Sequence, residues 1–305
     1  MIALAVAAAL ASALCFAVAG VLQQQAAALR PESEALSWRL VAALARRKRW
    51  LAGIGCAFAA YGFQSVALLW APLSLVQPII VSELVFAVPL SFRVHRLRPG
   101  PREWAGIGAV ACGLAVALVA AGPQGGAATA DAKGWVLALG AACVLVSAAV
   151  LLSRTVCGTA RSSMLALAGG VVMGVQSVLL AATIREWRDG AGAVFTSWQT
   201  YLLIVASLLG LLLIQSALST GPLASSLTVV DVTEPIVAVT IGIALFGESI
   251  TGGPMRLVWA ATGAVTALVG IVLLDTSPAV RTLHAGQQRA KPRDRGPVDT
   301  GHASS

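Results

Sequence analysis

Nine long apolar segments dominate this sequence. They lie at residues 2–22, 51–71, 73–92, 105–121, 134–152, 163–184, 201–219, 223–246 and 257–274. A helix that crosses a hydrocarbon layer of about 30 Å needs about 20 apolar residues, because each residue rises about 1.5 Å. None of the 21 Lys and Arg residues and none of the three His residues falls within these segments. The sequence therefore predicts an all-α polytopic membrane protein with nine transmembrane helices.

The composition excludes a water-soluble globular protein. Hydrophobic residues make up 58% of the chain and charged residues only 11%, whereas soluble proteins average about 45–50% and about 25%. We expect one transmembrane domain at residues 1–275 and a disordered basic tail at 276–305. Because the basic residues that give the net charge of +8 flank the apolar segments, we expect membrane lipid, and not nucleic acid, as their partner.

The distribution of Lys and Arg predicts the orientation. With nine helices, 17 of the 21 basic residues fall in the loops and tail on one side, and the positive-inside rule assigns that side, with the C-terminus, to the cytoplasm. We therefore expect a multi-pass protein of the plasma membrane. Residues 35–45 are apolar apart from Arg39 but too short to span, so they form either an interfacial helix or a degenerate tenth crossing, which decides the side of the N-terminus.

The two halves of the chain contain similar motifs. The matches pair Gln64-Ser65-Val66-Ala67-Leu68 and Pro72-Leu73 with Gln215-Ser216-Ala217-Leu218 and Pro222-Leu223, and Trp104 and Gly108 with Trp259 and Gly263. Each matched pair of helices is five crossings apart, so the two copies have opposite orientations in the membrane. We predict two inverted repeats, at about residues 1–121 and 134–275, which are typical of secondary transporters. The first half has one crossing too few, and residues 35–49 are where we expect the missing one.

Three acidic residues lie inside the predicted helices: Glu83, Asp231 and Glu234. A carboxylate inside a bilayer is costly unless it faces a cavity, a partner or a cation. The repeat aligns Glu83 with Glu234 to within a residue, and no basic residue lies in any span to pair with them. We predict that all three bind either a transported cation or a proton. Among cations, Mg²⁺ is well suited to a site made only of oxygen ligands. The alternative is protonated carboxyl groups that hydrogen-bond to neighbouring helices.

Prolines and glutamines accompany these carboxylates. Pro78 and Pro235 lie in the same spans as the acids, and because proline frees a carbonyl one turn earlier, we predict helix breaks there that expose backbone oxygens to the site. Gln64, Gln77 and Gln215 either line the same cavity or form hydrogen bonds between helices.

No motif predicts an enzyme or a cofactor. The three His residues lie in loops or in the tail, and the five Cys residues lack a Cys-x-x-Cys spacing, so neither a hydrolytic site nor a resident metal site is indicated. A membrane enzyme that modifies lipids and a non-transporting scaffold subunit are the remote alternatives. The oligomeric state is not indicated by the sequence.

The segments Ala71–Pro78 (APLSLVQP) and Glu83–Leu90 (ELVFAVPL) resemble the NIPA-like magnesium transporter branch of the drug/metabolite transporter (EamA-like) superfamily. The internal duplication and Phe246-Gly247-Glu248 resemble the superfamily as a whole. The resemblance implies transport of a small solute by alternating access without ATP hydrolysis, with nine helices in the magnesium branch and ten elsewhere. The alternative to a transported cation is an organic metabolite or drug, with Trp70, Trp104 or Gln64 lining the pocket.

Overall fold

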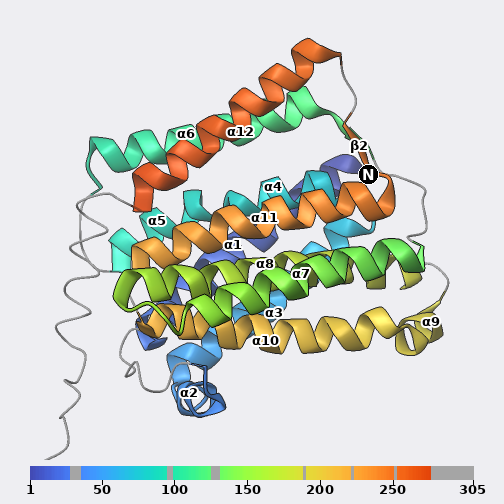
Figure 1. Ribbon diagram of the computed structural model, residues 1–305. Helices are drawn as coiled ribbons and strands as arrows, with labels where there is room; N and C mark the ends of the chain where they lie inside the picture. The colour runs from blue at the N-terminus through green and yellow to red at the C-terminus, as the bar shows by residue number, and fades with distance from the viewer. Residues whose placement is uncertain are drawn as a thin grey trace, which may run out of the picture.

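The computed structural model describes residues 1–27, 36–94, 99–124, 131–187, 190–220, 223–250 and 253–275. Helices form almost all of this part of the chain (Figure 1). The elements are α1 Ile2–Ala27, α2 Trp38–Leu44, α3 Lys48–Leu68, α4 Leu73–Val81, α5 Glu83–Val94, α6 Pro101–Ala121, β1 Pro123–Gln124, α7 Ala132–Leu152, α8 Gly158–Glu186, α9 Ala191–Thr196, α10 Trp198–Thr220, α11 Leu223–Phe246, β2 Ser249–Ile250 and α12 Pro254–Asp275.

The predicted number of membrane-crossing helices is confirmed. In the described residues, nine helical stretches are long and apolar enough to cross a membrane. One of them, Leu73–Val94, consists of α4 and α5 in succession. In the described part of the segment after α1, helix α2 has only seven residues, which is too short to be a tenth crossing. The predicted basic tail at 276–305 lies outside the described residues.

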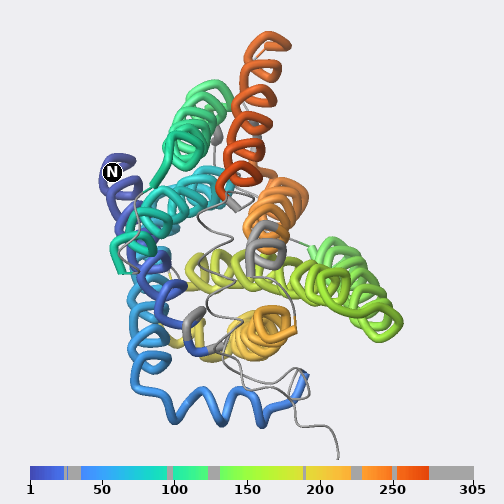
Figure 2. Tube along the Cα trace, turned by 90° about the vertical axis from the view of Figure 1, so that its left-hand side faces the viewer, coloured from blue at the N-terminus to red at the C-terminus, as the bar shows by residue number. Residues whose placement is uncertain are grey.

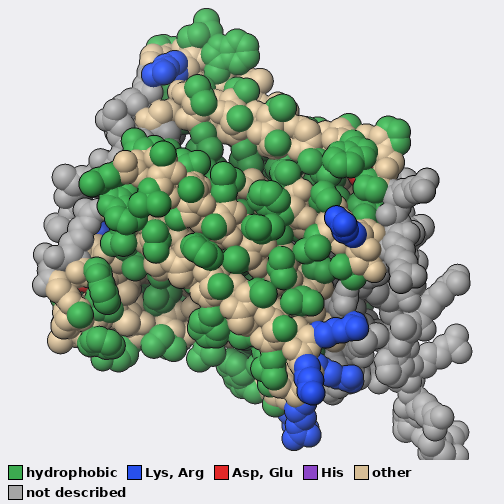
Figure 3. All heavy atoms as spheres, turned by 180° about the vertical axis from the view of Figure 1, so that it is seen from behind, with side chains coloured by type: hydrophobic (Ala, Val, Ile, Leu, Met, Phe, Trp, Pro, Cys, Tyr) green, Lys and Arg blue, Asp and Glu red, His purple; other side chains and the backbone are tan. Residues whose placement is uncertain are grey.

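The helices run side by side, so the bundle has two ends (Figure 1). We call one the α2 end, where α1, α5 and α10 finish and α3, α6 and α8 begin. We call the other the hairpin end, where β1 and β2 pair in antiparallel fashion. The exposed basic run from Arg46 to Arg49 lies at the α2 end, and Figure 3 shows Lys and Arg gathered towards one edge of a face that is otherwise mostly hydrophobic.

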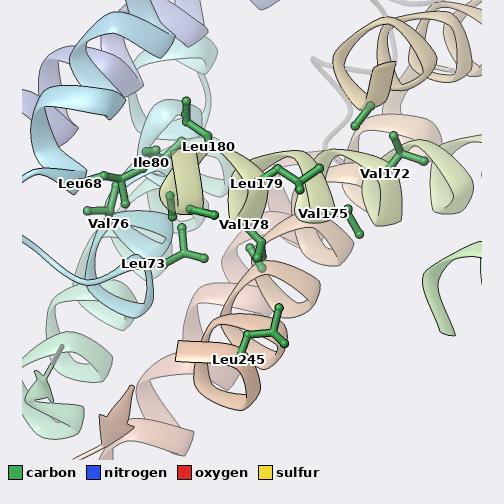
Figure 4. Close-up of a cluster of buried hydrophobic side chains, with 14 of the residues drawn as sticks. Leu68, Leu73, Val76, Ile80, Val172, Val175, Val178, Leu179, Leu180 and Leu245 are labelled. Atoms are coloured by element: carbon green, nitrogen blue, oxygen red, sulfur yellow. The ribbon is translucent and has the colours of Figure 1, made fainter. Parts of the chain in front are cut away.

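Helix α8 forms the centre of the bundle, because 83% of its most apolar stretch is buried. It packs along α10 and α11, and two glycines allow the close approach to α11. A Cβ atom on Gly170 would lie 2.8 Å from the Cβ of Thr233, and one on Gly174 would lie 2.8 Å from the carbonyl oxygen of Glu234. Figure 4 shows the side chains of α8 meeting those of α4 and α11 in the main hydrophobic core.

Helices α6 and α12 form a pair at one side of the bundle (Figures 1 and 2). Four glycines bring their backbones together: Gly106, Gly113, Gly263 and Gly270. A Cβ atom on Gly113 would lie 2.6 Å from the carbonyl oxygen of Gly263, and one on Gly263 would lie 2.6 Å from that of Gly113. Small residues allow this close approach of two helix backbones.

Candidate substrate cavity

A cavity of about 490 Å³ lies among α1, α3, α4, α5, α8, α10 and α11. Its apolar wall is rich in aromatic side chains, and Phe16 and Tyr61 meet edge to face with ring centroids 4.9 Å apart. The polar side chains of the lining are Gln23, Trp50, Tyr61, Gln77, Glu83, Ser207, Gln215, Asp231 and Glu234. None of the described residues that line it is Lys, Arg or His. The cavity is therefore an acidic site, with carboxyl groups and no basic side chain, enclosed mostly by apolar groups.

Glu83 directly follows Ser82, the single residue that separates α4 from α5. The amide N–H of Ser82 donates to the carbonyl oxygen of Ile79 at 3.0 Å, and that of Val85 donates to the carbonyl oxygen of Ser82 at 2.9 Å. These bonds span three residues instead of the four of an α-helix, so the backbone tightens locally. Glu83 is the first residue of α5, and the interruption brings its half-buried side chain to the cavity wall.

Glu234 faces the same cavity from α11. The hydroxyl of Ser177 on α8 donates to its Oε1 at 3.4 Å. The carboxyl groups of Glu234 and Glu83 are close enough to interact electrostatically, and both also interact with the Tyr61 hydroxyl. Asp231 lies one turn before Glu234 and lines the cavity as well. The structure thus brings together the three carboxylates that the sequence singled out.

The predicted glutamines divide into two groups. Gln77 and Gln215 line the cavity, and the Gln215 amide donates to the Gln23 carbonyl oxygen at 3.1 Å. Gln64 is 1% exposed and is not among the lining residues, because it lies one turn beyond Tyr61 on α3, further towards the hairpin end than the part of α3 that lines the cavity. Of the two alternatives predicted for these glutamines, lining the cavity therefore applies to Gln77 and Gln215 and not to Gln64.

The predicted tryptophans are also outside the cavity. The exposed fractions of Trp70 and Trp104 are 39% and 57%, and neither lines the cavity. Trp50 and Tyr61 take that place. The sequence analysis missed them, together with Gln23 and Phe16, because nothing in an apolar helix indicates which aromatic residues face inward.

The helix breaks are not at the predicted prolines. Helix α4 continues through Pro78, and α11 continues through Pro235. The interruption occurs instead at Ser82, between Pro78 and Pro89. A proline removes a single N–H donor, and the remaining bonds of α4 and α11 keep each segment helical. Pro235 still lines the cavity beside Glu234, whereas Pro78 does not.

A compact metal site is not formed by the described residues. Among them, no group of three or more His, Cys, Asp or Glu side chains could hold a metal ion. The acidic side chains instead lie around the cavity volume. This arrangement suits an extended solute better than a bare ion. Coordination of Mg²⁺ by Glu83, Asp231 and Glu234 stays a prediction.

Comparisons with known proteins give one informative relative. No family model matches the sequence, and no solved structure matches the fold. The chain is 31% identical to "Uncharacterized protein Cgl0250/cg0304" of Corynebacterium glutamicum over 289 residues, which cover 94% of this chain and 98% of the relative. The chain belongs to the same protein family as this corynebacterial protein.

Proposed function

We propose that this protein is a secondary transporter of the drug/metabolite transporter type that moves a small solute across the plasma membrane by alternating access. The observation that carries the proposal is the cavity with Glu83 from one half of the chain and Glu234 from the other. A site shared by two halves is what such transporters use, because rocking one half against the other exposes it to each side in turn.

The packing of the helices supports two inverted repeats. Helix α1 packs along α3 and contacts α4 and α5, as α8 packs along α10 and contacts α11, while α4 meets α11 and α6 meets α12 across the halves. These relations favour α1, α3, α4 with α5, and α6 as the counterparts of α8, α10, α11 and α12. Helix α7 then has no counterpart in the first half, because α2, with seven residues, is too short to provide one.

The chemistry of the cavity favours a small organic cation as the solute. Carboxylates attract a positive charge, and aromatic rings such as those of Phe16, Trp50 and Tyr61 bind both apolar groups and cations. A protonated amine on an apolar body satisfies both parts of the lining. Mg²⁺ is the second candidate, because carboxylate and amide oxygens are its preferred ligands.

Orientation follows from the charge at the two ends. The α2 end holds the exposed run Arg46–Arg49, so the positive-inside rule assigns it, and the C-terminus, to the cytoplasm. The cavity lies between the centre of the bundle and this end, because Gln23, Trp50 and Gln215 on its wall are near the ends of α1, α3 and α10 that meet there. We infer that the solute enters or leaves through the cytoplasmic side of this conformation.

Reconstituted protein tests the proposal. Liposomes containing the purified chain are given a gradient of tryptamine, tetramethylammonium or Mg²⁺, and charge movement and internal pH are recorded. We expect a current for an organic cation that Glu83→Gln and Glu234→Gln each reduce at least tenfold, because each removes a negative charge from the cavity. Glu186→Gln is the matched control, since Glu186 ends α8 outside the cavity.

The outcome separates the candidates. A current with Mg²⁺ alone favours the metal ion as the solute. Transport of the organic cations and of Mg²⁺ that is unchanged in both carboxylate variants would show that the acidic cavity is not the transport site.

A further inference from the structure

A polar contact outside the cavity joins the two halves at the hairpin end. Glu248 follows α11 after Gly247, whose φ of +59° turns the chain back. Its Oε1 accepts a hydrogen bond from the backbone N–H of Leu73 at 2.9 Å, and its Oε2 accepts one from Ser74 at 2.8 Å. The side chain of Glu248 is fully buried. A carboxylate from the second half therefore binds the first turn of α4 in the first half.

This contact completes the start of α4. The first N–H groups of a helix have no partner within it, and the residue that precedes α4 is Pro72, whose side chain makes no capping hydrogen bond. A negative charge at this end of a helix is also favourable because of the helix dipole. Glu248 provides the two acceptors and the charge that the local sequence lacks.

Arg185 holds the carboxylate from a third helix. It lies in the last turn of α8, and its Nη2 is 3.5 Å from Oε1 of Glu248. Its Cζ lies 4.0 Å from the ring centroid of Phe246, and the Phe246 ring meets that of Trp135 edge to face at 6.4 Å. Since the Arg185 side chain is 32% exposed, the pair lies at the boundary between the buried core and the surface of the hairpin end.

The contact lies on the side of the cavity away from α2. Leu73 precedes the cavity residue Gln77 by four positions on α4, which is about 6 Å along a helix. The cavity itself extends towards the α2 end, through Trp50 and Gln215. Opening it to the opposite side requires α4 and α11 to separate at the hairpin end, and this separation breaks both hydrogen bonds to Glu248.

We propose that Glu248, Arg185 and the backbone N–H groups of Leu73 and Ser74 form a latch that holds the hairpin end closed while the cavity faces the α2 end. The inference rests on the proposed function, in which the halves alternate between two arrangements. It adds the residues that stabilise one of them. In the transport cycle the latch breaks, the hairpin end opens, and the latch forms again when the cavity returns to the α2 end.

Distances across the hairpin end test the latch without any substrate. The five native cysteines are first replaced, and spin labels are then placed on cysteines introduced at the exposed residues Trp70 and Phe195. Double electron–electron resonance gives the distribution of distances between the two labels in lipid nanodiscs. We expect the open hairpin end to give a longer distance between the labels than the closed one. Glu248→Gln should raise the population of this longer distance about tenfold, because a charge-assisted contact shifts a two-state equilibrium by that order.

Two further variants make the test decisive. Arg185→Gln leaves the Glu248 carboxylate bound to the start of α4 but removes the cation beside it, so it should shift the distance distribution in the same direction. If Glu248→Gln does not fold, the Arg185 variant alone provides the test. Arg256→Gln removes an exposed charge at the same end and should change nothing. Unchanged distances in the Glu248 and Arg185 variants, or an equal shift in Arg256→Gln, would overturn the latch. Because the distances need no solute, this result stands whether or not the transport assays succeed.

Discussion

A single added methyl group should separate α6 from α12. In the Gly113→Ala variant the new Cβ atom would lie 2.5 Å from the backbone nitrogen of Ala267 and 2.6 Å from the carbonyl oxygen of Gly263. Ordinary contacts of this kind begin at 3.4 Å, so the two backbones must move apart by most of an ångström. The atoms in conflict belong to the main chain, which cannot rotate away as a side chain can.

Gly108→Ala, on the same helix, gives the matched comparison. A Cβ atom on Gly108 meets nothing within 4 Å, so the substitution only raises helix propensity and should stabilise by about 0.5–1 kcal/mol. Gly113→Ala has the same gain but also an overpacking cost of about 1–3 kcal/mol, since it disrupts a close-packed contact. We expect the free energy of unfolding of Gly113→Ala to be lower than that of Gly108→Ala by about 1–3 kcal/mol.

Reversible unfolding in mixed detergent micelles, followed by tryptophan fluorescence, measures this difference. Both variants and the unmodified chain are titrated with a denaturing detergent under one protocol. If Gly113→Ala is as stable as Gly108→Ala, the backbones of α6 and α12 are not in contact at Gly113, and the packing described for this pair is wrong.

Three other predictions concern orientation, a helix cap and the cavity wall. A membrane-impermeant maleimide should label the exposed Cys157, between α7 and α8, only from the cytoplasmic side; labelling in intact cells would reverse the assigned orientation. Asp131→Ala removes the acceptor of a 2.7 Å hydrogen bond from the Gly134 N–H and should cost about 1 kcal/mol in unfolding titrations, whereas an unchanged midpoint would argue against this cap. Gln215→Leu removes the hydrogen bond to Gln23 and should cost about 0.6–2 kcal/mol; equal stability of this variant and the unmodified chain would show that the bond contributes nothing.

The number of crossings was predictable because it depends on local composition. Each span is recognisable as about 20 apolar residues without a basic side chain, and the nine helices of the described residues agree with the nine apolar segments. Residues 35–45 were ambiguous for the same reason. Eleven apolar residues suit either a short surface helix or a damaged crossing, and only the structure shows a helix of seven residues.

The carboxylates were identifiable, but their surroundings were not. Glu83, Asp231 and Glu234 are unusual in spans that otherwise avoid charge, so composition alone singled them out. Which residues of these helices reach the cavity is harder to infer. Apolar residues lie on every side of each helix, so no periodicity distinguishes an inner from an outer face. Gln64 and Gln215 look equivalent in sequence, yet only Gln215 reaches the cavity.

Contacts between distant parts of the chain escaped sequence reasoning altogether. Glu248 binds the amide of Leu73 across 175 positions, and no local pattern indicates that a helix which begins after Pro72 takes its cap from elsewhere. The break at Ser82 has a similar origin. Proline chemistry predicts weakened helices at Pro78 and Pro235, but where the backbone tightens depends on how the neighbouring helices pack.

Two engineered disulfides test whether the two halves must move relative to each other about the cavity. A Cβ atom on Gly242 of α11 would lie 3.6 Å from the Cβ of Leu73 on α4, within the range of about 3.5–4.5 Å that disulfides require. Leu73→Cys with Gly242→Cys therefore links the halves at the hairpin end. Gly169→Cys with Leu213→Cys has the same separation of 3.6 Å but links α8 to α10 within one half.

Transport is measured in proteoliposomes for both pairs, in a chain without its native cysteines, before and after oxidation. We expect oxidation to abolish transport in the Leu73–Gly242 pair and a reducing agent to restore it, whereas the Gly169–Leu213 pair keeps its transport when oxidised. Full transport by the oxidised Leu73–Gly242 pair would show that the solute crosses without separation of the two halves at the hairpin end, and alternating access about this cavity would then be wrong.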